Sequence, residues 1–317
     1  LDLWLGWTFL LGLLQFLHLF APLRAWTVLP LLALGVGFWV RSGPAPFALR
    51  RNPPAPATLA CAGAWLIAAM WISARAMQTP PEFDGGLYHF HAIRWINEAR
   101  ITPGVGNLHG RLAFNSAFYS FVAALNLPPL FGHGRAIANS FLCLTVFAQI
   151  LHRLHGTVTR TPATPGGLAP LANLLALPLV GYLTLTSLGL ASPSADLASS
   201  FVQIAIFLLL VRGLDAWRAR LPDQDARVAT LVLLSVTLVT LKLSNLGFAA
   251  GVAALGVAYS RHARLAASRV RTIAAVGAAL AAIWLARGYV MSGFPCYPST
   301  LGGIAFDWAV PAEQAKR

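Results

Sequence analysis

The sequence predicts an all-α fold, a polytopic bundle of transmembrane helices that forms one domain over residues 1–317. Hydrophobic residues make up 57% of the chain and charged residues only 10%, whereas about a quarter of the residues in a soluble protein are charged. The bilayer is therefore the main solvent of the chain. Backbone groups find no partners in hydrocarbon, so spanning segments must be helices or strands of a closed barrel, and long apolar runs favour helices.

Nine apolar runs approach the length of about 20 residues that one helical crossing needs. The first run lacks a preceding basic segment and a small-residue cleavage site, which favours a span over a signal peptide. The predicted spans lie at residues 3–22, 25–40, 57–76, 136–151, 168–187, 197–212, 228–245, 246–260 and 272–290.

These spans divide the domain into four parts. They are the N-terminal spans (3–76), a polar loop (78–135), the remaining spans (136–290) and a tail (291–317). Because the chain begins with Leu1 rather than Met and stops at Arg317 in a polar stretch, we interpret it as a truncated piece of a longer protein.

The basic residues predict the orientation of the bundle. The formal charge is +13, but Lys and Arg fall between apolar runs rather than along one stripe with stacking aromatics, so no nucleic acid partner is expected. If the stretch 112–131 does not span, four loops share one side, which the positive-inside rule makes cytoplasmic and which anionic membrane lipids should contact. These loops hold 13 of the 23 basic residues: Arg41, Arg50, Arg51, Arg153, Arg160, Arg212, Arg218, Arg220, Arg227, Arg261, Arg264, Arg269 and Arg271.

The apolar stretch 112–131 is the uncertain element of this topology, and its composition argues against a span. Asn115, Ser116 and Tyr119 interrupt it, and Pro128-Pro129 ends it. We therefore predict a helix at 112–127 that lies on the outer face or dips into it. The loop 78–135, the loop around Asp196 and the tail then lie on the outer side together.

An amphipathic surface helix is predicted at 87–98, after the Gly85-Gly86 turn. Its apolar residues recur every three positions and can rest on the bilayer or on the bundle: Leu87, Phe90, Ile93 and Ile96. The opposite edge carries Asp84, Tyr88, His91 and Glu98. Asp84 is an N-cap of this helix, or a carboxylate placed to act as a general base or to bind a cation; both roles are compatible.

Histidines gather in the same loop, which holds four of the eight in the chain: His89, His91, His109 and His133. Neutral histidines beside carboxylates suit proton transfer or hydrogen bonding to phosphate and hydroxyl groups, although they could equally face lipid headgroups. Two helical residues separated by two positions point about 200° apart. No metal site is therefore predicted from His89 and His91.

The arginines Arg94, Arg111 and Arg135 of this loop are placed on the outer side, against the positive-inside trend, which predicts an anionic partner. Arg111 follows a glycine-rich turn, where the backbone can approach a phosphate or carboxylate closely, and Asn115 comes shortly after it. Topology adds Asp196, which could instead cap the next helix. It also adds Lys242, near the outer end of an apolar run, which is either functional or snorkelling to the interface.

Three strings in the chain are similar to an uncharacterised bacterial family of polytopic membrane proteins related to the type C glycosyltransferase fold. They are Asp-Gly-Gly-Leu-Tyr-His from Asp84, Gly-Asn-Leu-His-Gly-Arg-Leu-Ala-Phe-Asn-Ser from Gly106, and Gly-Phe-Pro-Cys-Tyr-Pro-Ser-Thr from Gly293. The order of Asp84, two outer helices and Arg135 also resembles that fold, and the resemblance covers about residues 80–310. The chain departs from the type C pattern because the Asp follows the third span rather than the first and no soluble C-terminal domain is present.

The resemblance implies a bacterial inner-membrane enzyme, with its active face outward, that moves a sugar from a polyprenyl-phosphate donor to a glycan, lipid or protein acceptor. The candidate catalytic residues are Asp84 and His91. The candidate substrate-binding residues are Tyr88, His89, Arg94, His109, Arg111, Asn115, Arg135, Asp196 and Lys242. In the type C enzymes the loop Asp is a base or a metal ligand, which leaves a divalent metal ion as an open cofactor. A transporter, flippase or ligase for lipid-linked glycans and a non-catalytic scaffold are the alternatives.

Overall fold

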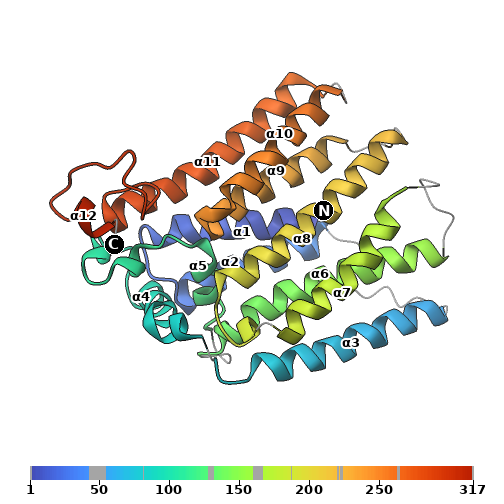
Figure 1. Cartoon of the computed structure of the whole chain (residues 1–317), viewed down its shortest axis with the longest axis horizontal. Helices are drawn as coiled ribbons and strands as arrows, with labels where there is room; N and C mark the ends of the chain where they lie inside the picture. Colours follow the sequence, from blue (N-terminus) through green and yellow to red (C-terminus); the bar gives the residue numbers. More distant parts are fainter. Residues whose placement is uncertain are drawn as a thin grey trace.

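The computed structural model describes residues 2–42, 55–80, 82–127, 132–159, 167–186, 188–219, 221, 224–262 and 265–315. Within these residues every regular element is helical and no strand occurs. The predicted all-α class is thereby confirmed. The described part of the chain contains nine long helices that run lengthwise, and the elements of the outer loop lie at one end of them (Figure 1).

The long helices follow the predicted spans closely. They are α1 (Asp2–His18), α2 (Ala25–Ser42), α3 (Pro56–Ala76), α6 (Gly134–Thr159), α7 (Ala169–Thr186), α8 (Ala195–Arg218), α9 (Gln224–Leu241), α10 (Leu246–His262) and α11 (Ala267–Ser292). Seven described segments are long and apolar enough to cross a membrane: α3, α6 to α9, α11, and Leu243–His262, in which the 3₁₀ turn η5 (Leu243–Asn245) extends α10. The helix α1 and the apolar part of α2, Ala25–Arg41, each comprise 17 residues and are shorter than this criterion. That α1 and α2 also cross the membrane, which would make nine spans, therefore remains a prediction.

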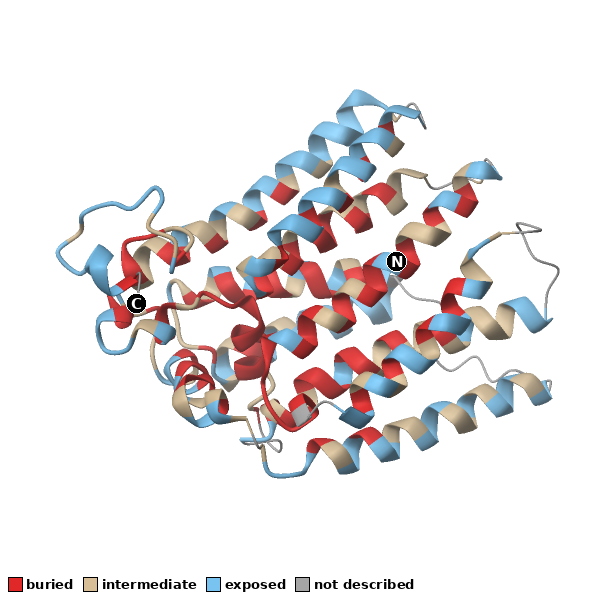
Figure 2. Ribbon diagram, viewed as in Figure 1, coloured by how far each residue is buried: buried red, intermediate tan, exposed pale blue. Residues whose placement is uncertain are grey.

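Large apolar side chains cover the outer faces of the bundle. Phe38 on α2, Met70 on α3 and Leu175 on α7 are exposed by 74%, 75% and 63%. Buried residues concentrate instead where α1, α5, α8 and α9 meet in the middle of the molecule (Figure 2). A soluble protein rarely exposes contiguous apolar surface on this scale, so lipid is the solvent that these faces fit.

The short helix α5 (Ala117–Ala124) corrects the prediction of a surface helix at 112–127. A 3₁₀ turn, η3 (Gly110–Ala113), precedes it, and all eight residues of α5 are buried. It packs against α1, α4 (Phe90–Glu98), α6 and α9 rather than lying on the outer face. Small and aromatic residues alternate around the whole helix without a polar stripe, so every side of it can be buried. As predicted, α5 does not cross the bundle.

Another small helix, α12 (Ala312–Ala315), ends the described part of the tail beside the outer loop (Figure 1). The two meet directly, because the Asn107 side chain donates a hydrogen bond to the Trp308 carbonyl at 2.7 Å. The helix ends that flank the four basic loops lie at the opposite end of the bundle (Figure 1). The chain therefore separates a polar end, with the outer loop and the tail, from an arginine-rich end.

Cysteine labelling can test which end faces out. In a variant with Cys61, Cys143 and Cys296 replaced by alanine, a membrane-impermeant maleimide should label Phe83→Cys on intact cells. It should label Val158→Cys only after the membrane is opened, because the two exposed side chains (80% and 79%) lie at opposite ends. Labelling of both positions from the same side would contradict the topology.

Candidate functional site

A π-helical turn, η1 (Gly85–His89), opens the outer-loop helix. The backbone N–H of Phe90 donates to the carbonyl of Gly85, five residues earlier. Tyr88 and His89 lie on the buried face of the helix, whereas His91 is exposed.

The predicted polar edge of Asp84, Tyr88, His91 and Glu98 is therefore wrong: its members point in different directions. Asp84 precedes η1 with helical backbone angles, and its side chain caps no backbone N–H. Its carboxylate instead accepts a hydrogen bond from the guanidinium of Arg111 at 2.5 Å. Of the two roles weighed for Asp84, the structure shows no N-cap.

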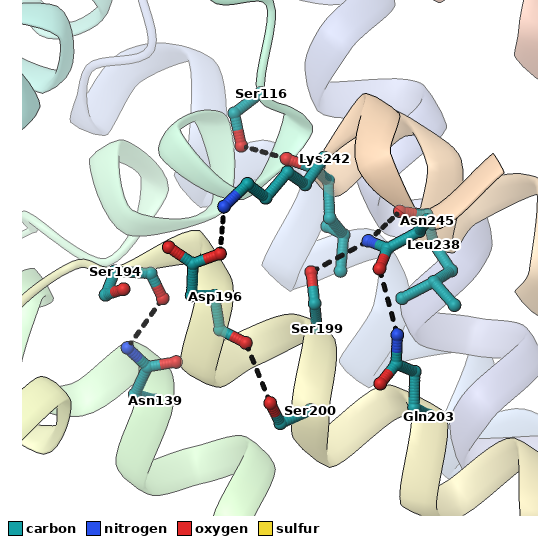
Figure 3. Close-up of polar contacts among 11 residues, drawn as sticks. Ser116, Asn139, Ser194, Asp196, Ser199, Ser200, Gln203, Leu238, Lys242 and Asn245 are labelled. Carbon is teal, nitrogen blue, oxygen red and sulfur yellow. Dashed lines mark hydrogen bonds and ion pairs between the residues drawn. The ribbon is translucent and has the colours of Figure 1, made fainter. Parts of the chain in front are cut away.

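Two ion pairs organise the polar end. The first joins Asp84 and Arg111, whose side chains are 46% and 44% exposed, and the Arg111 guanidinium lies 5.5 Å from the centre of the Tyr88 ring. The second joins Asp196, in the first turn of α8, to Lys242 (Figure 3). Water screens pairs that are this exposed, so each contributes little to stability. Both remain accessible to a ligand.

Asp84 and Asp196 line one cleft of about 430 Å³, although 112 positions separate them in the sequence. His89 lies in the same cleft, with Glu82, Ser194 and Ser200. The cleft therefore presents three carboxylates and an imidazole together, and the cations Arg111 and Lys242 are bound to two of these carboxylates, Asp84 and Asp196.

Burial controls the protonation of the aromatic groups behind this cleft. It lowers the pKa of His89 below the ordinary 6.5, against the opposing effect of Asp84 and Asp196. His89 is therefore neutral at pH 7, and its Nδ1 has no hydrogen-bond partner among the described residues. The rings of Tyr88 and Tyr119 contact the imidazole, and burial raises the pKa of both phenols. The imidazole of His89 and the phenols of Tyr88 and Tyr119 are thus uncharged at pH 7.

The predicted span 228–245 included Lys242 near its outer end, but the structure places this lysine outside the helix. Helix α9 ends at Leu241, and Lys242 is the first residue of the turn to α10. Ser116 anchors this turn by donating to the Leu241 carbonyl at 2.7 Å (Figure 3). The lysine is exposed and reaches across to Asp196.

Two buried asparagines that the sequence prediction missed fix the loops around Asp196 and Lys242 (Figure 3). The Asn139 amide donates to the carbonyls of Ser192 and Ser194 at 2.9 and 3.1 Å. The Asn245 amide donates to the Ser199 hydroxyl at 2.9 Å. Asparagines within apolar runs were the available signal, because a buried amide must find partners.

The other predicted site residues lie elsewhere. His91 and His109 are exposed and do not line the cleft. Arg94 pairs with Glu98 at 2.8 Å, and Arg135 donates to the Ala191 carbonyl at 2.6 Å. These two arginines line a separate cleft of about 280 Å³. They could serve a ligand there, but they do not contribute to the cleft of Asp84.

Asn115, predicted to bind substrate, belongs to a buried network instead. Its amide donates to the Trp284 carbonyl at 2.5 Å, and its Oδ1 accepts from Nε of Arg287 at 3.1 Å. Arg287 is only 1% exposed and also contacts Nδ1 of His18 at 2.7 Å. The network ties the outer loop to α1 and α11. The signal that could have revealed it was an arginine inside the apolar run 272–290.

Among the described residues, no group of three His, Cys, Asp or Glu side chains is arranged to hold a metal ion. Of the three carboxylates that line the cleft, Asp84 and Asp196 are each bound to a cation.

Comparison with known proteins places the chain in a family. The model of a family described as a domain of unknown function (DUF8201) matches residues 1–317, the whole chain. The chain belongs to this family. No curated protein and no solved structure matches it. Membership in this family agrees with the expectation of an uncharacterised family.

Proposed function

We propose that the protein is a membrane glycosyltransferase that resembles the type C enzymes and moves a sugar from a polyprenyl-phosphate carrier to an acceptor at the outer face of the bacterial inner membrane. One observation carries the proposal: Asp84 and Asp196 line one cleft, and each carboxylate is paired with a cation, Arg111 or Lys242. The cleft lies at the end of the bundle opposite the arginine-rich end, which the positive-inside rule assigns to the cytoplasm.

The two cations suit the phosphate of the carrier. The Arg111 guanidinium can bind two phosphate oxygens at once, and Lys242 supplies a mobile point charge. In the free protein both are neutralised by carboxylates. A phosphate that enters the cleft competes for these cations and releases Asp84 and Asp196. Donor binding would therefore free the base that the reaction needs.

In the proposed reaction the acceptor hydroxyl oxygen attacks the anomeric carbon of the sugar. The bond from that carbon to the carrier phosphate oxygen breaks, and the electron pair leaves with the polyprenyl phosphate. Asp84 takes the hydroxyl proton, while Arg111 and Lys242 stabilise the charge that develops on the departing phosphate. No oxidant, reductant or further reactant is required.

His89 replaces His91 as the histidine of the site. It is buried, neutral and in the cleft, whereas His91 is exposed outside it. A neutral imidazole can donate a hydrogen bond to a sugar or acceptor hydroxyl and accept one from it. We assign His89 to positioning of substrate rather than to proton removal.

The alternative of a transporter or flippase required Lys242 and Asp196 to line a path through the bundle. Both residues lie instead at its polar end, in the α9–α10 turn and the first turn of α8. Glycosyl transfer at a surface cleft accounts for their position better. A scaffold without activity would not need the two carboxylates in one cleft.

Binding of undecaprenyl phosphate tests the role of the cations. Arg111→Gln and Lys242→Gln should each weaken its binding to the purified protein about 10-fold or more, since each removes a charge-assisted contact. Binding is measured by titration followed by tryptophan fluorescence. Arg94→Gln is the matched control, because Arg94 is an outer arginine in a different cleft. Equal affinity in all three variants and the wild type would contradict the proposal.

A further inference from the structure

At the opposite end of the bundle three arginines from three helices come together, and none of them has an acidic partner among the described residues. Arg153 lies on α6, Arg212 on α8 and Arg227 on α9, and α8 packs against both other helices. Each is half-buried, and Arg212 lies within electrostatic range of both Arg153 and Arg227. We call these residues the arginine triad.

Two described carboxylates on α8 and α9 have partners outside the triad. Asp225 pairs with Arg269 at 3.6 Å, and Oδ2 of Asp215 accepts a hydrogen bond from the backbone of Ala169 at 2.7 Å. None of the ion pairs among the described residues includes a member of the triad. Nε of Arg227 is buried and has no hydrogen-bond partner among the described residues. Three like charges that are partly removed from water are costly unless an anion compensates them.

An apolar cleft lies against α8 and α9, the helices that carry Arg212 and Arg227. It has a volume of about 270 Å³ and is lined by α8, α9 and α10, with Leu214 and Leu255 among its residues. Trp217, Tyr259 and His262 also line it, and the Trp217 and His262 rings lie 5.2 Å apart. The Tyr259 hydroxyl donates to the Gly213 carbonyl at 3.2 Å, and Arg227 lies within electrostatic range of this tyrosine.

We propose that the arginine triad and this cleft form a binding site for one anionic phospholipid, with its phosphate among the arginines and an acyl chain in the cleft. Charge complementarity identifies the headgroup, and the apolar lining beside it identifies the chain. The site lies in the leaflet at the arginine-rich end and is independent of the proposed activity at the polar end. The bound phospholipid would stabilise the packing of α6, α8 and α9, because its phosphate neutralises the repulsion between the three arginines.

The test uses the purified full chain after lipid removal, with thermal unfolding followed by tryptophan fluorescence. Phosphatidylglycerol should raise the Tm by about 3 °C or more, because it binds the folded state, and phosphatidylcholine should raise it less. Equal shifts with the two lipids would overturn the proposal. So would an equal shift with inorganic phosphate, which would indicate a site for a free phosphate group instead.

Arg212→Gln separates the triad from general damage. Without lipid this variant should be at least as stable as the wild type, because it relieves repulsion, and it should lose the shift with phosphatidylglycerol. Arg218→Gln, an exposed charge on the same helix, should keep that shift. If Arg212→Gln fails to fold, Arg153→Gln replaces it with the same expectation. A full phosphatidylglycerol shift in the folded triad variant would contradict the site.

Discussion

Replacing Asp84 by Asn is expected to abolish sugar transfer, with a rate at least about 100-fold lower, since a positioned general base contributes that much or more. The amide keeps the size of the side chain but cannot take a proton. The ion pair with Arg111 is exposed, so the variant should insert and fold like the wild type. Transfer from a polyprenyl-phosphate sugar to acceptor, measured in membranes with equal amounts of protein, gives the result.

Two variants make this experiment specific. Glu98→Gln removes an exposed carboxylate from the same outer loop and should leave transfer unchanged. Asp196→Asn removes the other carboxylate of the cleft and frees Lys242, so donor binding should change more than the chemical step. Full activity of Asp84→Asn would remove the proposed mechanism. Loss of activity in Asp196→Asn alone would move the base to Asp196.

Asn115→Leu is expected to have the largest effect on stability. The substitution leaves the buried Arg287 without its Oδ1 acceptor and removes the side-chain donor of the Trp284 carbonyl, which keeps its helical partner within α11. A hydrogen bond to a buried charge contributes about 1.5–3 kcal/mol, and a neutral hydrogen bond contributes about 0.5–1.5 kcal/mol. We therefore expect a loss of roughly 2–4 kcal/mol, seen as a lower Tm of the purified protein.

A second substitution distinguishes this network from a substrate contact. Arg287→Met in the Asn115→Leu background removes the uncompensated charge, so the double variant should be more stable than Asn115→Leu alone. A substrate-binding role for Asn115, as the sequence suggested, predicts instead a normal Tm with weaker substrate binding. A Tm unchanged by Asn115→Leu would show that the network contributes little.

The sequence could predict the helical class and the approximate helices because apolar runs and loop charges report the bilayer directly. It also predicted that Asp196 and Lys242 would share an end of the bundle with the loop 78–135, since alternating crossings place them there. It could not predict the ion pairs between Asp84 and Arg111 or between Asp196 and Lys242, because tertiary packing sets them.

Local geometry accounts for the remaining errors. The sequence placed Tyr88 and His91 on one polar edge, but Tyr88 lies on the buried face of the helix together with Ile93 and Ile96, and His91 lies outside that face. The apolar composition of α5 did not say whether lipid or protein would cover it, and protein does. Asn115 follows a glycine-rich turn that suggested a ligand, yet its partners are Trp284 and Arg287, about 170 positions away.

The lipid that co-purifies with the protein tests the central claim most directly. Mass spectrometry of the wild type gently extracted from its native membrane should detect a polyprenyl phosphate or its glycosylated form. The lipid should be lost from the Arg111→Gln/Lys242→Gln double variant and retained by the Arg94→Gln control. Recovery of ordinary phospholipids alone, in equal amounts from all three proteins, would contradict a carrier-phosphate site in this cleft.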